Sequence, residues 1–250
     1  MSEVALIDEG QRLVEAAGER NLVLRLLGAL GIQCRCAGSW RIAERAGRIT
    51  GDIDLVGPGR QWSDLVSFFE SLGYGVDERW AMLHGKDRLI FFHPSGFRVD
   101  VFLDKLNMAH VLDLKERLSI HPVTVPLADL LLQKLQIVEL TSKDAIDILV
   151  LLREHLLSDG EDAINVPYLS GLLANDWGFW HTATKNMVHV RDEWVSNPKV
   201  LGDGDRDVVR DRLEELLGRV ETEPKTLRWK LRAKIGTRVR WYQDVDEFRR

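Results

Sequence analysis

The chain has 250 residues, more than the usual single-domain size of about 100–150, so we expect an α/β domain with a smaller second domain. Hydrophobic residues make up 45% and charged residues 29% of the sequence, which excludes a disordered or fibrous protein. The formal net charge is −5. Its apolar runs are too short to span a bilayer and its acidic start does not resemble a secretory signal, so we expect a cytoplasmic protein without a membrane partner.

Helical and strand patterns alternate over the first 120 residues, which predicts an α/β domain there. Apolar residues recur at helical spacing from Gln11 to Leu30, and Gly31 is expected to end that helical region. The elements expected next are a strand at 32–36, a helix at 40–46, a strand at 52–56, a helix at 65–72, and a hairpin of strands at 88–92 and 97–103.

Residues 121–250 show helical periodicity without strand signals, and we expect a second, helical domain there. The predicted helices cover 127–139, 143–157 and 206–220. From Lys225 to Arg250 there are nine basic and three acidic residues, a charge of +6 that leaves −11 on the rest. This basic C-terminal segment, which also contains Trp229, Trp241 and Tyr242, indicates either an anionic partner such as RNA or a solvated basic helix.

Three aspartates carry the chemistry that the sequence suggests. Asp52 and Asp54 lie at positions i and i+2 of an expected strand, so their carboxylates project from one face and repel each other unless they share a cation. Asp100 interrupts the apolar strand at 97–103 and can supply a third carboxylate from a neighbouring strand. Carboxylate oxygens are ligands that Mg²⁺ or Mn²⁺ prefers, and a pair of such ions catalyses phosphoryl transfer.

Gly38 and Ser39 add a phosphate-binding candidate. They follow an expected strand, begin a short helix and precede Asp52 by about a dozen residues. A glycine lets the backbone approach a triphosphate, and the helix start and the Ser39 hydroxyl can donate hydrogen bonds to it.

The run Ala37-Gly38-Ser39, followed by Arg48-Ile49-Thr50-Gly51-Asp52-Ile53-Asp54-Leu55, resembles the glycine-serine and DxD signature of the nucleotidyltransferase superfamily, which has the DNA polymerase β-like fold. Asp100 matches the third acid. The segment 125–135 and then Lys143-Asp144-Ala145-Ile146-Asp147 resemble the K…KDxxD element of AbiEii-like and minimal nucleotidyltransferases. The resemblance covers roughly residues 25–155.

This resemblance implies a small mixed sheet followed by a helical domain, with catalytic and metal-binding Asp52, Asp54 and Asp100. It further implies that the nucleotide is bound by Gly38, Ser39, Arg48, Lys134 and Lys143. The implied reaction moves a nucleoside monophosphate from an NTP to RNA or tRNA, a protein or a small molecule, as toxin-like or antibiotic-modifying enzymes do. A non-catalytic nucleotide- or RNA-binding protein on the same fold is the alternative.

Lys134 has two interpretations. It stands within an apolar helical stripe, where a lysine is rarely buried without a partner. It either pairs with a carboxylate such as Asp144 or Asp147, or faces the nucleotide phosphates as the resemblance implies.

Overall fold

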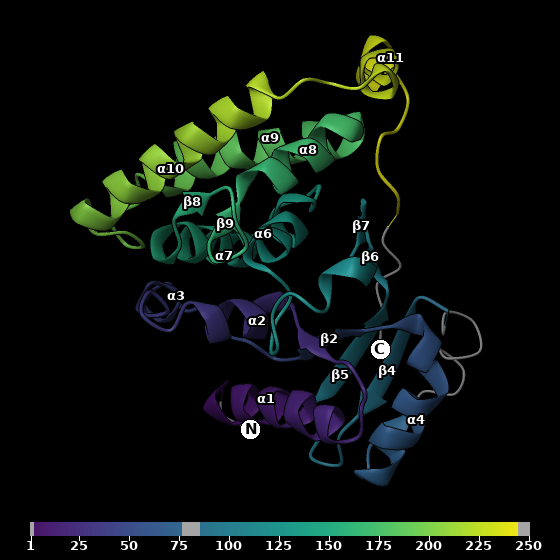
Figure 1. Cartoon of the computed structure of the whole chain (residues 1–250). Helices are drawn as coiled ribbons and strands as arrows, with labels where there is room; N and C mark the ends of the chain where they lie inside the picture. Colours follow the sequence, from purple (N-terminus) through teal and green to yellow (C-terminus); the bar gives the residue numbers. More distant parts are fainter. Residues whose placement is uncertain (1–2, 77–85, 245–250) are drawn as a thin grey trace. The chain divides into compact units, whose positions relative to one another are not determined.

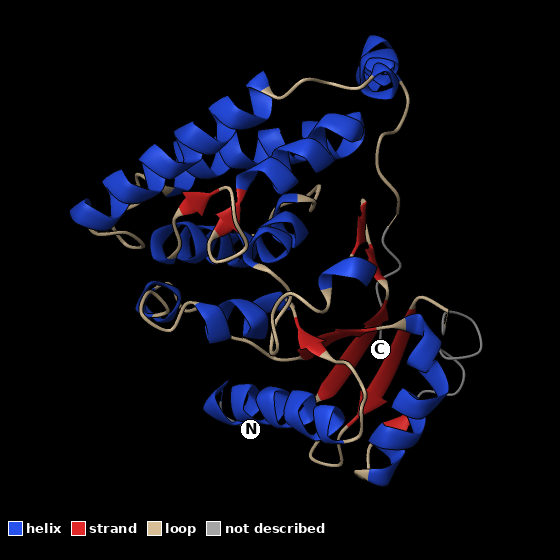
Figure 2. Cartoon of the chain, in the orientation of Figure 1, coloured by secondary structure: helices blue, strands red, loops and turns tan. Residues whose placement is uncertain are grey.

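The computed structural model describes residues 3–76 and 86–244 and confirms a mixed α/β architecture with a largely helical C-terminal half (Figures 1 and 2). The chain forms two compact units. The first comprises residues 1–37, 49–106 and 112–126, and the second comprises 38–48, 107–111 and 127–250. No helix within the described residues is long and apolar enough to cross a membrane.

The first unit is built on a five-stranded mixed sheet with the order β1-β2-β5-β4-β3. Its central strands β2 and β5 are parallel, whereas the other neighbours are antiparallel. The strands are β1 (Arg25–Leu26), β2 (Ile53–Gly57), β3 (Gly75–Val76), β4 (Arg88–Phe92) and β5 (Arg98–Leu103). The expected strands at 52–56, 88–92 and 97–103 are thus confirmed to within a residue. The β4–β5 hairpin turns at Gly96, whose φ of 96° suits glycine.

The helices of the first unit pack on one face of this sheet. They are α1 (Glu3–Glu19), α2 (Gly28–Arg35) and α4 (Trp62–Ser71), with a 3₁₀ turn at Gly59–Gln61 and another at Lys115–Arg117. Every second strand residue, such as Leu55 and Val101, enters the shared apolar core. Phe69 of α4 stacks on Phe91 of β4 with centroids 4.1 Å apart. The intervening residues, including Asp54 and Asp100, therefore belong to the opposite face of the sheet.

The expected strand at 32–36 is wrong, because these residues continue α2, and Gly31 lies inside that helix instead of ending a preceding one. The local pattern of β-prone residues is overruled by packing, since Ala29, Leu30 and Ile32 of this helix are buried in the core. Cys34 and Cys36 at the end of α2 are both free thiols.

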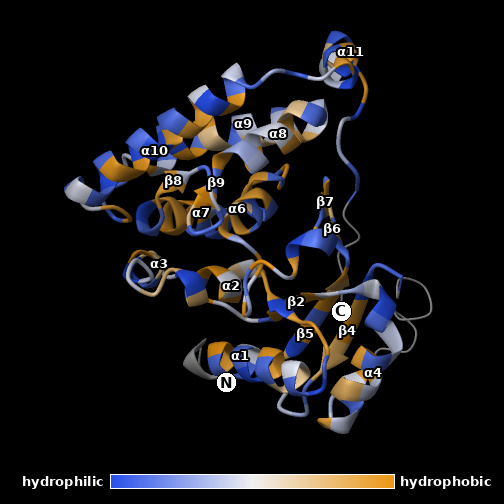
Figure 3. Ribbon diagram, viewed as in Figure 1, coloured by the Kyte–Doolittle hydropathy of each residue, from blue (hydrophilic) through white to orange (hydrophobic). Residues whose placement is uncertain are grey.

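The second unit is a helical bundle. It contains α3 (Arg41–Arg45), α6 (Leu127–Leu135), α7 (Ser142–Glu154), α8 (Val166–Asn175), α9 (Trp177–His189), a π-helical turn (Val190–Trp194), α10 (Asp203–Thr222), α11 (Leu227–Ile235) and a 3₁₀ turn (Gly236–Arg238). Helix α6 packs against α7, α8 and α9, and α10 against α7 and α8. Figure 3 shows α10 as mainly hydrophilic, and its buried stripe is limited to Val209, Leu213, Leu216 and Val220.

Two short strand pairs lie outside the main sheet. Strands β6 (Lys105–Asn107) and β7 (Val111–Asp113) pair with each other, as do β8 (Leu157–Ser158) and β9 (Ile164–Asn165). The expectation of no strands beyond residue 120 is therefore wrong for β8 and β9, which are too short to give a periodic signal.

Candidate functional site

The sheet brings two of the three candidate acids side by side. Asp54 of β2 and Asp100 of β5 are direct partners in the parallel register. Asp52 lies just before β2, and its side chain is 49% exposed, whereas Asp100 is fully buried. Alternation along β2 places Asp52 and Asp54 on the same face. The first unit thus offers an exposed, a half-buried and a buried carboxylate along neighbouring strand segments.

Two arginines neutralise Asp100. Arg88 of β4 lies 3.0 Å from Oδ2 of Asp100, and Arg98 of β5 lies 3.0 Å from the same oxygen. Arg98 also donates to Oδ2 of Asp52 at 3.2 Å, so its guanidinium bridges two of the candidate acids. The Arg88 guanidinium lies over the ring of Phe102, 4.9 Å from its centroid. Ion pairing compensates the desolvation of Asp100, which would otherwise be a buried carboxylate without a counter-ion.

Gly28, which the sequence analysis missed, forms the backbone turn beside Asp54. It begins α2 with a φ of 65°, and a Cβ atom at this position would lie 2.2 Å from Oδ2 of Asp54. The amide of Leu27 donates to the carbonyl of Asp54 at 3.0 Å. The N-cap residue of α2, Leu27, makes no side-chain capping bond. The glycine-containing run Leu27-Gly28-Ala29-Leu30-Gly31 was the sequence signal that could have indicated this turn.

Gly38 and Ser39 belong to the other unit and do not follow a strand. They form a turn between α2 and the five-residue helix α3, and Ser39 is buried. The Gly38 backbone lies against Glu154 of α7, because a Cβ there would come within 2.9 Å of Oε1. Arg41 donates to the Gly38 carbonyl at 2.7 Å. The strand–glycine–helix context that suggested phosphate binding at Gly38 is therefore present at Gly28.

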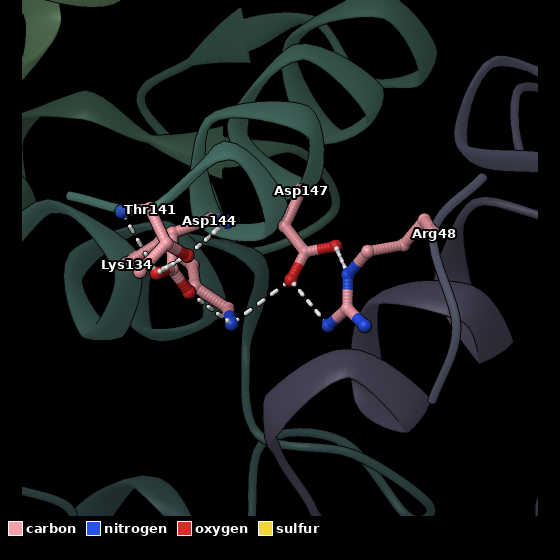
Figure 4. A network of polar contacts seen from close by, with 5 residues as sticks. All are labelled: Arg48, Lys134, Thr141, Asp144 and Asp147. Carbon is pink, nitrogen blue, oxygen red and sulfur yellow. Dashed lines mark hydrogen bonds and ion pairs between the residues drawn. The ribbon is translucent and has the colours of Figure 1, made fainter. Parts of the chain in front are cut away.

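Arg48, Lys134 and the two aspartates of α7 form one buried ionic network within the second unit (Figure 4). Arg48 makes a bidentate contact to Asp147, with both N–O distances at 3.1 Å. The Lys134 ammonium bridges Asp147 at 2.9 Å and Asp144 at 3.0 Å. Thr141 is the N-cap of α7 and forms a capping box with Asp144, and its hydroxyl also donates to the Asp144 carboxylate at 2.6 Å. Two cations thus meet two carboxylates, and carboxylate pairing, one of the two interpretations of Lys134, is present.

The network ties stability to pH. Burial alone would lower the pKa of Lys134, but the charges of Asp147 and Asp144 raise it above 10.5. Burial would raise the pKa of Asp144, but Lys134 and the Thr141 hydrogen bond lower it below 3.8. We expect the free energy of unfolding to fall below pH 3.8, through the folded-state pKa of Asp144, and to fall again above pH 10.5, through that of Lys134. Urea titrations at several pH values measure the loss of stability at acidic and at alkaline pH. In Lys134→Met the loss above pH 10.5 should be smaller.

Lys143 lies in the first turn of α7 and is exposed. No hydrogen bond or ion pair of its ammonium is seen among the described residues. Its position leaves it accessible to a soluble anion.

The donor chemistry at the sheet fits a hard divalent cation in part. Asp52 and Asp54 provide oxygen ligands on one face. Asp100, however, directs its oxygens to Arg88 and Arg98, and within residues 3–76 and 86–244 no three His, Cys, Asp or Glu side chains are grouped closely enough to hold a metal ion. A cation at Asp52 and Asp54 would therefore have to compete with Arg98 for the third acid.

The sequence matches no protein-family model and no curated protein. Among solved structures, the chain is similar to the antibiotic-resistance factor ANT(2'')-Ia, whose structure was determined in solution. The two are 15% identical, the match covers 88% of this chain and 97% of that one, and the TM-score is 0.33. A likeness of this size assigns no family.

Proposed function

We propose that this chain is a metal-dependent nucleotidyltransferase that transfers a nucleoside monophosphate from an NTP to an acceptor and releases pyrophosphate. The observation that carries the proposal is the direct pairing of Asp54 with Asp100 on parallel strands, with Asp52 two residues before Asp54. The turn at Gly28 adds a helix start beside these acids. The resemblance of residues 48–55 to the R-x-T-x-D-I-D-L pattern supports the same reading.

Asp52 and Asp54 are the proposed ligands of Mg²⁺ or Mn²⁺, and Asp100 is the proposed third acid. When bound, the metal would neutralise charge on the phosphates and on the leaving pyrophosphate. The acceptor oxygen forms a bond to the α-phosphorus while the bond to pyrophosphate breaks, and one of the carboxylates takes the acceptor's proton. Arg48, Lys134, Lys143, Gly38 and Ser39 remain proposed nucleotide-binding residues.

The acceptor belongs to one of three classes: RNA or tRNA, a protein, or a small molecule. The basic residues of 225–250 favour RNA, because Lys and Arg side chains neutralise backbone phosphates. A cytoplasmic location and a toxin–antitoxin role are both compatible with an enzyme that modifies RNA.

Labelling with all four α-labelled NTPs tests the proposal. The protein is incubated with Mg²⁺ and, separately, with total RNA, protein extract and small-molecule extract. We expect release of pyrophosphate together with transfer of label to one of the three, and loss of both in Asp54→Asn. Binding of an NTP without label transfer or pyrophosphate release would instead favour a non-catalytic nucleotide- or RNA-binding protein.

Arg98 provides a test of the metal site that does not depend on turnover. Because its guanidinium bridges Asp52 and Asp100, it occupies the charge environment that a divalent cation needs. We expect Arg98→Gln to bind Mn²⁺ at least about fivefold more tightly, since an ion pair near a protein surface contributes up to about 4 kcal/mol at 4 Å. Isothermal titration or electron paramagnetic resonance of Mn²⁺ measures the change. Arg60→Gln, on the 3₁₀ turn before α4, is the control, and equal affinities would contradict a cation site at these acids.

A further inference from the structure

A pocket of about 650 Å³ lies within the second unit, and its lining does not include Asp52, Asp54 or Asp100. Its walls come from the turn at 109–111, the junction of α8 and α9 at 175–178, and α11 with the segment that follows it, up to Gln243. The volume falls within the roughly 300–1,000 Å³ of small-ligand sites. A pocket of this size accommodates one nucleotide.

Residues 241–243 form one wall of the pocket and are held there by specific contacts. The amide of Gln243 donates to the carbonyl of Ala109 at 2.9 Å. Trp241 donates from Nε1 to the hydroxyl of Thr182 at 3.1 Å. Its carbonyl oxygen would lie 2.5 Å from a Cβ at Gly178, so glycine is what allows the segment to lie against the start of α9. These contacts hold the pocket wall in a defined position.

Aromatic rings form much of the lining. Trp177, Trp229, Trp241 and Tyr242 all contribute, and the last three are half-buried, so each presents part of its ring to the pocket. Trp229 rests edge-on against Trp180 at 5.0 Å between centroids, and Trp241 rests edge-on against Tyr242 at 5.2 Å. Supported rings with accessible surface are suited to stacking on a planar ligand.

Cations surround these rings. Arg228, Arg232 and Arg240 line the pocket, and α11 carries Lys230 and Lys234 as well. Arg232 is oriented over Trp177 at 4.8 Å and by bonds to the carbonyls of Gly236, Val239 and Arg240. The ligand that this charge fits is therefore anionic.

The other groups reduce this positive charge without reversing it: Asp176 adds one negative charge to the lining, and Arg240 is paired with Asp244. The Asp176 carboxylate is engaged in capping α9, where it accepts from the amide of Phe179 at 3.0 Å. Burial lowers the pKa of His110 to about 4, so its imidazole is neutral near pH 7. His110 contacts the Thr182 hydroxyl at 2.9 Å and stacks on Phe179. The pocket combines stacking surfaces with a net positive charge.

We propose that this pocket receives an unpaired base of a single-stranded nucleic acid, with the flanking phosphates on the basic residues of α11. An acidic peptide would satisfy the cations but would leave the ring surfaces without a planar partner, so the combination favours a nucleic acid. The proposal names RNA as the acceptor class and in this respect rests on the proposed function. The binding itself needs no turnover and can be tested separately.

The test is fluorescence anisotropy with labelled single-stranded RNA and DNA oligomers of about ten nucleotides, within the usual site size for such proteins. Trp229→Leu, which retains apolar packing against Trp180, should weaken RNA binding at least fivefold, about 1 kcal/mol. Trp229→Phe should recover most of the affinity. Arg228→Gln should flatten the slope of log affinity against log salt by about 0.7.

Trp62→Leu, a change of an exposed tryptophan on α4, is the matched control and should bind as the unchanged protein does. Thermal melts confirm that each variant is folded. Equal binding by Trp229→Leu, tighter binding of duplex than of single strands, or comparable binding of poly-glutamate would overturn the proposal. If DNA binds more tightly than RNA, the pocket would still be a single-strand binding site, but RNA would be contradicted as its ligand. Asp54→Asn should bind RNA normally while losing transfer. If the unchanged protein binds RNA through this pocket but transfers no label, the result counts against the proposed activity alone.

Discussion

Replacing Asp54 by asparagine is expected to lower NTP turnover at least about a hundredfold, or 2.7 kcal/mol, with little change in thermal stability. The substitution preserves the size of the side chain and removes the charge that pairs in register with Asp100 and faces the Gly28 turn. Asp52→Asn should also lower NTP turnover, but by a smaller factor, since Asp52 is half exposed and its charge is screened by water and by Arg98. Steady-state release of pyrophosphate measures both.

Glu70→Gln is the control for removing a carboxylate from the same unit. Glu70 is exposed on α4, whose buried face packs on the sheet. NTP turnover by Glu70→Gln should equal that of the unchanged protein. Near-normal turnover by Asp54→Asn, in a preparation free of other nucleotidyltransferases, would rule out the assigned metal ligands.

Replacing Asp147 by asparagine is expected to lower the free energy of unfolding by about 3–5 kcal/mol. The change removes a carboxylate that contacts both Arg48 and Lys134, whose side chains are almost fully buried. A shift in the melting midpoint on the order of 10 °C follows for a protein of this size. Calorimetry measures it. Asp159→Asn is the control, because its ion pair with Arg219 is exposed, and such pairs contribute at most about 1 kcal/mol.

Lys134→Met and Asp144→Asn separate the structural role of the network from nucleotide binding. Both variants break the same ion pair, but only the first removes the cation. If Lys134 contacts the triphosphate, Lys134→Met raises KM for NTP at least about tenfold, or 1.4 kcal/mol, whereas Asp144→Asn leaves KM near normal. Equal KM values in the two variants would limit Lys134 to stabilising the fold.

Local patterns were sufficient to predict three of the five strands of the main sheet, β2, β4 and β5. The alternation of apolar and polar residues around Asp54 and Asp100 predicts a strand at each position. It also predicts that both aspartates lie on the face opposite the apolar core, because side chains repeat with a period of two residues. Register between distant strands has no such local signal. The direct pairing of Asp54 with Asp100 and the convergence of Arg88 on Asp100 therefore emerge only from the folded sheet.

The glycine beside the acids was harder to predict than the acids. Gly28 begins one short helix and Gly38 precedes another, and the sequence alone gives no φ value or approach distance to distinguish them. The serine after Gly38 made it the better motif, and the supposed strand at 32–36 supported that interpretation. Residues 28–35 instead form a helix, so the strand–glycine–helix context lies at Gly28 beside Asp54, whereas Gly38 lies beside Glu154 and stays a proposed nucleotide-binding residue.

Neither compact unit is a continuous stretch of polypeptide, and this has a consequence for synthesis on the ribosome. The chain changes unit after residues 37, 48, 106, 111 and 126. Residues 38–48, which include Arg48, leave the ribosome before Lys134 and Asp147 do. Their part of the ionic network can therefore form only after α6 and α7 have been synthesised. Assembly of the second unit is therefore completed late in translation. A fragment ending near residue 126 would leave the Arg48 side chain without the Asp147 carboxylate, and it would expose the apolar surface of segment 38–48 that α7 normally covers.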